Sequence, residues 1–316
     1  MLNKNKIAVI IPCYRVLSQL PSVLKKIPSY VDFIILVDDR CPDNSVEITL
    51  RKTGKKTKIH AIYHEKNMGV GGAVVSGYKK ALELKADIFV KVDGDGQMDP
   101  SKIRELILPL TKNEADYAKG NRFRDFSALK SMPKVRLIGN SILSFLIKCA
   151  SGYWNIMDPT NGFTAINKNA VQSLPLNKLA KRYYFETDML INLNIKNKVI
   201  KDVPISAVYA DEKSSLSIVH SILTFPVKIF FSMLKRIIFK YYVYDFNMAS
   251  LYLLFGLPML LFGALFGLYK WYFSLINNTA TSTGTVMLAV LPLILGTQFI
   301  LQAINIDMNN IPRKER

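Results

Sequence analysis

The sequence predicts an α/β fold with a largely parallel sheet, followed by two membrane-spanning helices. Up to about residue 170, short apolar runs alternate with amphipathic stretches. This alternation is typical of strands and helices that follow one another in a parallel sheet. Nearer the end of the 316-residue chain, two long stretches are apolar and almost free of charge, as expected of helices that cross a bilayer.

Five apolar runs are predicted strands, and four amphipathic stretches are predicted helices. The strands are Ile7–Ile11, Phe33–Val37, Lys58–Tyr63, Ile88–Val92 and Asp116–Lys119. The helices are Ser18–Ile27, Ser45–Thr53, Gly71–Leu84 and Pro100–Leu110. In sheets of this kind ligands collect beyond the carboxyl ends of the strands. The residues that follow each strand are therefore the first candidates for a site.

Polar or glycine-rich segments follow each of the first four strands. They are Pro12-Cys13-Tyr14, Asp38-Asp39, the segment from Asn67 to Gly72, and Asp93-Gly94-Asp95-Gly96-Gln97. Asp38 and Asp39 could bind a base or a ribose. The glycines after Asn67 permit close backbone approach, and free N–H groups at a helix start attract anions. This segment fits neither a P-loop nor a dinucleotide fingerprint, so a plain junction between loop and helix is its alternative interpretation.

We place the chemistry at the acidic cluster after the fourth strand. An extended backbone projects Asp93 and Asp95 to the same side, where they can share one hard cation. Such a cation would offset charge on a departing phosphate. A calcium loop of the EF-hand kind is excluded, because Met98 takes the place of its glycine and Arg104 that of its closing glutamate. An ordinary acidic turn, with Asp99 capping the next helix, remains an alternative.

Arginines after the fifth strand could clamp phosphates. Arg122 and Arg124 follow that strand, and Arg136 lies at the start of a further predicted helix. A guanidinium fork matches phosphate oxygens bidentately. A solvated surface arginine is the alternative at each position.

Charge and hydropathy together indicate a membrane protein. Lys and Arg number 42 against 24 Asp and Glu, which gives a formal net charge of +18 and suggests a polyanionic partner. A nucleic-acid binder would explain the charge, but it would not explain the predicted spans Met248–Phe273 and Gly284–Ile306. Two buried helices of a soluble core are the alternative. Because Lys270 is the only cation between the spans, both termini are expected in the cytoplasm.

Two further expectations concern the termini and the cysteines. The apolar stretch near the first residue is too short for a signal peptide and suits a first strand. Cys13, Cys41 and Cys149 show no metal-ligand spacing and are expected to be reduced thiols, mostly packing residues.

The segment Ser217–Asp245 is expected to lie in the membrane interface. It is mostly apolar, and its cations recur at roughly helical spacing, which is typical of a basic amphipathic helix beside a span. These cations are Lys228, Lys235, Arg236 and Lys240. We expect Pro226 to divide the segment into two short helices. A core helix of the soluble domain is the alternative.

Taken together, the strand-end motifs resemble those of family 2 glycosyltransferases. The matching segments, in the family's order and spacing, are Ile11–Tyr14, Val37–Asp39, Asn67–Ala73, Asp93–Gln97 and Gly120–Phe123. The resemblance covers roughly residues 5 to 215 and looks closest to the synthases of dolichol- and polyprenyl-phosphate sugars. It implies a GT-A fold and a nucleotide-sugar donor.

The resemblance also implies roles for single residues. Pro12, Tyr14, Asp39 and Asp93 hold the nucleoside, and Asp95 and Gln97 ligate Mg²⁺ or Mn²⁺. Arg122 and Arg136 match arginines that contact the diphosphate and the lipid phosphate, while Lys213 corresponds only loosely to a phosphate-covering lysine of the family. We add Asp38, Asn67 and Gly71 to the predicted nucleotide-sugar site, Asp93 to the metal site, and count Arg122 as catalytic.

The acceptor side is less defined. Asp158–Phe163 resembles the family's acceptor segment, and Phe185–Leu190 stands where related transferases carry an acidic pair that supplies the base. Asp188 is the better candidate for that base and Glu186 the second. A lipid phosphate is already an anion at neutral pH and needs no base, whereas a sugar hydroxyl does. With a phosphate acceptor, Asp188 would instead position the acceptor or a cation.

The sequence therefore predicts a membrane-anchored, inverting glycosyltransferase that moves one sugar from a nucleotide donor to polyprenyl phosphate on the cytoplasmic face. UDP is favoured over GDP, and the absence of the Gln-x-x-Arg-Trp motif favours single transfers. The expected domains are a catalytic domain over 1–216, amphipathic helices over 217–245 and a two-helix anchor over 246–316. Gly263 and Gly267 suggest a homo-oligomer contact. The alternatives are a transferase that extends a lipid-linked sugar with Asp188 as base, and a non-catalytic nucleotide-sugar-binding protein.

Overall fold

The computed structural model describes residues 5–53, 58–122, 134–205 and 218–314. The chain forms two compact units. One comprises the chain up to Arg236 together with the C-terminal residues from Pro312, and the other spans Ile237–Ile311. The first unit contains the sheet, and the second contains the two long apolar helices.

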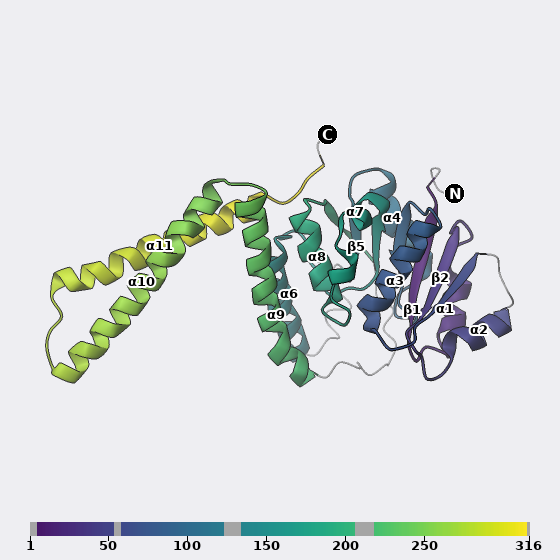
Figure 1. Cartoon of the computed structure of the whole chain (residues 1–316), viewed down its shortest axis with the longest axis horizontal. Coiled ribbons are helices and arrows are strands. Elements are labelled where there is room, and N and C mark those ends of the chain that lie inside the picture. Colours follow the sequence, from purple (N-terminus) through teal and green to yellow (C-terminus); the bar gives the residue numbers. More distant parts are fainter. Residues whose placement is uncertain (1–4, 54–57, 123–133, 206–217, 315–316) are drawn as a thin grey trace. The chain divides into compact units, whose positions relative to one another are not determined.

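The first unit is built on a seven-stranded sheet in the order β3-β2-β1-β4-β6-β5-β7; Figure 1 labels β1, β2 and β5 of this sheet. Its strands are β1 (Ile7–Cys13), β2 (Phe33–Asp38), β3 (Ile59–Tyr63), β4 (Ile88–Lys91), β5 (Tyr117–Asn121), β6 (Thr164–Asn167) and β7 (Ile200–Pro204). Strand β6 runs antiparallel to β4 and β5, and all other neighbouring pairs are parallel. The predicted, largely parallel sheet is confirmed, and the five predicted strands are present with ends shifted by at most two residues.

Helices pack on both faces of this sheet. They are α1 (Leu20–Lys26), α2 (Ser45–Thr53), α3 (Gly69–Glu83), α4 (Ile103–Thr111), α6 (Lys134–Ser151), α7 (Lys168–Ser173) and α8 (Phe185–Ile195). Alternate residues of β1 face opposite sides. Val9 belongs to a core cluster that includes residues of α1 and α4, whereas Ile10 lies against Gly77 of α3, where any added side chain would collide with it. The four predicted helices are all present, and Asp99 caps the 3₁₀ turn η1 (Pro100–Lys102) by accepting the Ser101 N–H.

Helix α9 (Ile218–Ile238) passes through Pro226 without interruption, so the predicted division at this proline is wrong. Proline removes one helical hydrogen bond but does not end a helix that packing holds on both sides of it. Here the Phe225 ring lies 5.9 Å from the Tyr184 ring. Further along α9, the Arg236 guanidinium donates to the Ala150 and Cys149 carbonyls at the end of α6.

Two of the three cations of α9, Lys228 and Lys235, are exposed as the predicted basic amphipathic helix requires, and the third is not. Arg236 is only 2 % exposed, because it caps α6. In the second unit, Lys240 of the π-helical segment η3 (Phe239–Val243) is likewise buried and donates to the Asn310 carbonyl. The exposed side chains of α9 include Val227, Phe230 and Phe231. The exposed side chains of the helix are therefore both apolar and basic.

The second unit is a hairpin of two long helices, α10 (Met248–Asn277) and α11 (Thr283–Asn309), which run side by side (Figure 1). Asn247 and Ser250 form a capping box at the start of α10, and Ser282 caps α11. Both helices are long and apolar enough to cross a membrane, and only 11 % and 6 % of their most apolar windows are buried. Such exposure contradicts the alternative of two buried core helices.

The hairpin uses its glycines for contacts within the chain. A Cβ at Gly263 would lie 2.7 Å from the Ala289 carbonyl oxygen, and one at Gly296 would lie 2.5 Å from the Leu260 nitrogen. Gly263, which suggested an oligomer contact, thus permits close approach of α10 and α11. Whether copies of the chain associate stays a prediction.

We expect Gly263→Val to destabilise the hairpin by about 1–3 kcal/mol, because the added side chain forces the two helices apart. Gly284→Val is the matched control, since a Cβ at Gly284 meets nothing within 4 Å. Thermal unfolding of the full chain in detergent measures both. Equal melting temperatures for the two variants would contradict this packing.

Candidate active site at the carboxyl edge of the sheet

The ends of β1, β2 and β4 bring the predicted nucleotide-binding residues to one edge of the sheet. Cys13 pairs with Asp38 in the parallel register, and the Asp39 N–H donates to the Cys13 carbonyl. A Cβ at Gly94 would lie 3.3 Å from the Pro12 carbonyl oxygen. Tyr14 is 44 % exposed, so its ring is open to a ligand. The edge therefore has an exposed aromatic ring beside two groups of carboxylates.

The carboxylate of Asp39 is hydrogen-bonded to other groups of the protein. It accepts the Met68 and Gly69 N–H groups, both at 2.7 Å, and lies 2.8 Å from His64 Nδ1. The Asn67 side chain donates to the Asp39 carbonyl. Asp39 and Asn67 thus fasten the start of α3, as a helix cap does. One carboxylate oxygen of Asp38 accepts a hydrogen bond from the Cys41 N–H. Burial raises the pKa of Asp38.

The glycine segment at the start of α3 packs closely against the chain itself, and its role in binding an anion stays a prediction. The Gly72 N–H donates to the Lys181 carbonyl, and a Cβ at Gly71 would collide with the Ala180 carbonyl and with Phe185. The chain's own backbone thus fills the space that a side chain at position 71 would need. The glycines are required here for close packing of α3 against residues 180–185.

The acidic turn after β4 has the donor set for a hard cation. Asp93 and Asp95 are both partly buried, Gln97 is exposed, and Gly96 turns the chain at a φ of +78°. The Gln97 N–H donates to Asp95 Oδ1. Within the described residues no group of three His, Cys, Asp or Glu side chains could enclose a metal. Two carboxylates and an amide suit Mg²⁺, which typically takes its remaining ligands from water and substrate phosphates.

A buried lysine joins this turn to two other segments. Lys91 Nζ lies 2.9 Å from Asp93 Oδ1 and 3.0 Å from Glu186 Oε1, and it donates to the Gly162 carbonyl at 3.3 Å. Burial alone would lower the pKa of Lys91, but the two carboxylates outweigh it and raise that pKa above its usual value. Lys91 is therefore a permanent cation.

Arg122 is held by the predicted acceptor segment. Its Nε and Nη2 donate to the two oxygens of Asp158 at 2.7 and 3.0 Å, and its backbone N–H donates to Asp158 as well. Asp158 is fully buried, whereas the Arg122 side chain is 35 % exposed. The guanidinium is thus fixed in orientation but accessible. The Arg136 side chain, Arg124 and Lys213 lie outside the described residues.

The two acidic candidates on α8 have different partners. Asp188 accepts the Ala180 N–H and the Asn192 side chain, both at 2.8 Å, and burial raises its pKa. These contacts hold it away from Lys91. Glu186 is the carboxylate that Lys91 links to Asp93. The first turn of α8 places Glu186 and Asp188 in different surroundings, and this the sequence alone did not reveal.

Sequence reasoning also missed a buried polar pair beside Arg122. Lys119 and Asp202 are neighbours in the β5–β7 register. Lys119 is fully buried and donates to the Asn161 carbonyl, and burial lowers its pKa to about 8. Asp202 Oδ2 accepts hydrogen bonds from Asn121 Nδ2 and from the Met157 N–H. Its Oδ1 is buried and has no hydrogen-bond partner among the described residues. A lysine inside a predicted strand was the available signal.

Asp202 is expected to make stability depend on pH. Burial raises its pKa to about 6 from the usual 3.8, so between these values the folded chain binds the proton more tightly than the unfolded chain. The free energy of unfolding then falls as pH rises from about 4 to about 6. Asp202→Asn removes this loss. Its stabilising effect should therefore be roughly 2–3 kcal/mol larger near pH 7.5 than near pH 4. Denaturant unfolding at the two pH values measures the difference, with Glu105→Gln as an exposed control; an equal effect at both values would contradict it.

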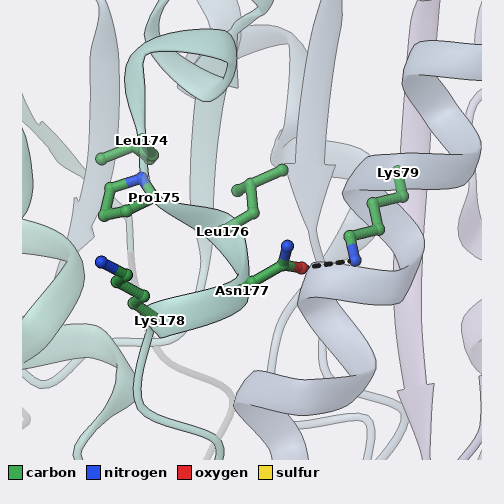
Figure 2. Close-up of a pocket in the computed structure, with 6 residues that line it drawn as sticks. All are labelled: Lys79, Leu174, Pro175, Leu176, Asn177 and Lys178. Carbon is green, nitrogen blue, oxygen red and sulfur yellow. Dashed lines mark hydrogen bonds between the residues drawn. The ribbon is translucent and has the colours of Figure 1, made fainter.

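The hollow in Figure 2 is not part of this edge. It is lined by Lys79 of α3 and by residues 174–178, and Lys79 Nζ donates to Asn177 Oδ1 at 2.7 Å. None of its lining residues follows the carboxyl end of a strand in the parallel part of the sheet.

The comparisons with known proteins identify the class of enzyme to which this sheet and the residues at its carboxyl edge belong. The model of glycosyl transferase family 2 matches residues 8–174. The chain belongs to this family and is a glycosyltransferase.

Several characterised relatives use lipid phosphates, according to their names. The chain is 36 % identical to the UDP-N-acetylglucosamine–dolichyl-phosphate N-acetylglucosaminyltransferase of Methanococcus voltae, over 65 % of this chain and 86 % of that one. It is 26 % identical to the undecaprenyl-phosphate mannosyltransferase of Micrococcus luteus, over 64 % and 84 %. The match places the chain in the polyprenyl-phosphate branch of the family.

A solved structure supports the fold. Glucosyl-3-phosphoglycerate synthase from Mycobacterium tuberculosis, in complex with Mn²⁺, uridine diphosphate and glucosyl-3-phosphoglycerate, matches 74 % of this chain and 80 % of its own. The TM-score is 0.54 and the identity 17 %. The predicted GT-A fold is confirmed.

Proposed function

We propose that this chain transfers one sugar from a UDP-sugar to polyprenyl phosphate at the cytoplasmic face of a membrane, with inversion at the anomeric carbon. An oxygen of the lipid phosphate forms the new bond to the anomeric carbon. The bond from that carbon to the diphosphate breaks, and the nucleoside diphosphate leaves with the electron pair. The reaction transfers no proton.

One observation carries the proposal. Both acidic residues that could serve as a base already bind other groups of the protein. Asp188 is bound by the Ala180 N–H and by Asn192, and Glu186 is paired with the permanently charged Lys91. Each carboxylate is therefore already engaged by groups of the chain itself. An acceptor that is already an anion fits this site better than a sugar hydroxyl.

The Arg122 guanidinium suits a phosphate acceptor. Its Nε and Nη2 are occupied by Asp158, and the partly exposed side chain places a fixed positive charge at the edge of the site. A pre-oriented cation attracts an anionic acceptor without further ordering of its own side chain.

The donor would lie across the ends of β1, β2 and β4. The exposed Tyr14 ring can stack on the base, and Asp38 lies at the end of β2. Asp93, Asp95 and Gln97 would hold Mg²⁺ or Mn²⁺, which supplies positive charge for the diphosphate. A relative and a structural neighbour that both use uridine nucleotides support UDP as the nucleotide.

The membrane arrangement supports a lipid substrate. Helices α10 and α11 are candidate spans, and α9, whose exposed side chains are apolar and basic, precedes them in the chain. We place these side chains in the lipid interface, with the sheet and both termini in the cytoplasm on the basis of flanking charge. The division into a catalytic domain, interface helices and an anchor follows from this arrangement.

A panel of donors and acceptors tests the proposal. Purified full chain in nanodiscs is given UDP- and GDP-sugars, with polyprenyl phosphate, polyprenol or a glycosylated polyprenyl phosphate, and with Mn²⁺, Mg²⁺ or a chelator. The expected result is transfer that requires a UDP-sugar, the lipid phosphate and a metal. Transfer only to the glycosylated lipid would instead support the extending transferase, and donor binding with no transfer to any acceptor would contradict both.

A further inference from the structure

The buried ammonium group of Lys91 has no role in the reaction as proposed. Lys91 is 1 % exposed, although it lies on strand β4 only two residues before the acidic turn. An amino group in such a place must be paired, because an isolated buried charge is very unfavourable. Its partners determine what it does.

Those partners come from three separate segments. Asp93 follows β4, Gly162 belongs to the loop before β6, and Glu186 lies in the first turn of α8. A Cβ at Gly162 would lie 2.5 Å from Lys91 Nζ and 2.7 Å from Asp93 Oδ2. The absence of a side chain at Gly162 thus makes room for the contact between the ammonium and the carboxylate.

The same contact occupies a ligand of the proposed metal site. Lys91 Nζ forms an ion pair with Asp93 Oδ1. A divalent cation would therefore bind the other oxygen of Asp93 together with Asp95 and Gln97. It would also lie close to the fixed positive charge of the ammonium, and like charges at such distances repel each other strongly in a partly buried site. The protein groups alone would then hold the cation weakly.

We propose that Lys91 is a positioning residue that keeps the site weak for a free divalent cation and makes tight metal binding depend on a nucleoside diphosphate. The diphosphate adds the negative charge and the oxygens that the protein groups lack. Metal and donor then bind together, and the empty site does not retain a cation. This inference rests on the proposed function, since it takes Asp93, Asp95 and Gln97 as the metal ligands.

Manganese binding tests the inference without measuring turnover. Free Mn²⁺ is followed by electron paramagnetic resonance as the full chain in detergent is titrated, with and without UDP. The variants are Lys91→Met, which removes the charge, and Lys91→Arg, which keeps it. Glu186→Gln is the matched control, because it leaves the pair between Lys91 and Asp93 intact.

The native chain and Lys91→Arg are expected to bind Mn²⁺ at least about tenfold more tightly with UDP than without it. Lys91→Met should bind Mn²⁺ without UDP about ten- to a hundredfold more tightly than the native chain, and the effect of UDP should shrink. Glu186→Gln should not bind Mn²⁺ more tightly than the native chain, because it removes a nearby negative charge.

Unchanged or weaker Mn²⁺ binding by Lys91→Met would overturn the inference and leave the proposed function standing. If the native chain bound no Mn²⁺ even with UDP, the metal site itself would be wrong. Should Lys91→Met fail to fold, the double variant Lys91→Met with Glu186→Gln leaves no unbalanced charge between these two positions and is compared with Glu186→Gln alone. Tighter Mn²⁺ binding by the double variant supports the inference, and equal binding overturns it.

Discussion

Replacing Asp95 by alanine is expected to lower the rate of sugar transfer by about a hundred- to a thousandfold. Asp95 is the proposed metal ligand that the buried Lys91 does not contact, so its loss removes a main source of charge compensation for the departing diphosphate. Transfer of a radiolabelled sugar to polyprenyl phosphate measures the effect. Glu105→Ala is the matched control, since Glu105 pairs only with the exposed Lys102.

The fold should survive the substitution at Asp95. The partly buried carboxylate accepts the Gln97 N–H, and the loss of one such bond costs about 1 kcal/mol, to which the loss of its other contacts adds. A melting temperature close to that of the native chain would separate lost chemistry from lost structure. More than a tenth of the native activity in Asp95→Ala, at saturating metal, would contradict the proposed role.

Replacing Arg122 by lysine is expected to lower kcat/KM for the lipid phosphate by at least about tenfold, and replacing it by alanine by about a hundredfold. Lysine keeps the charge but cannot make the paired bonds to both oxygens of Asp158 that orient the guanidinium. The expected change is mainly in the KM for the acceptor, because the residue binds and orients that anion. Steady-state kinetics with varied polyprenyl phosphate measures it.

The alanine variant has a second consequence. It leaves the fully buried Asp158 without its charged partner, which typically costs about 3 kcal/mol or more. Unfolding measurements on both variants therefore accompany the kinetics, and Arg51→Ala serves as an exposed control. Native kcat/KM in Arg122→Lys would show that the oriented guanidinium of Arg122 has no part in acceptor binding.

Much of the fold could be predicted from the sequence because its early strands are apolar runs with turn residues between them. Strands β6 and β7 were not predicted. Each is short and carries polar residues, such as Thr164 and Asp202, whose surroundings arise only when distant strands pair. Pro226 was misleading because local preference for a helix end is weaker than packing on both sides.

The site was predicted at the level of its motifs, but contacts between distant segments decided what several residues do. Gly71 lies in a glycine segment that suits an anion, and only the fold shows that the same residue packs against residues 180–185. Lys91 and Glu186 are 95 positions apart, so no local pattern could pair them. Arg236 was expected at a lipid surface, and it is buried because it caps α6.

The soluble product of the reaction tests the central claim most directly. The full chain is incubated with a UDP-sugar and polyprenyl phosphate, and the released nucleotide and the lipid product are identified by mass spectrometry. Attack of the lipid phosphate on the anomeric carbon predicts release of UDP and a lipid that carries one phosphate and one sugar. Release of UMP with a lipid diphosphate would contradict the account, because a different bond of the donor would then have broken.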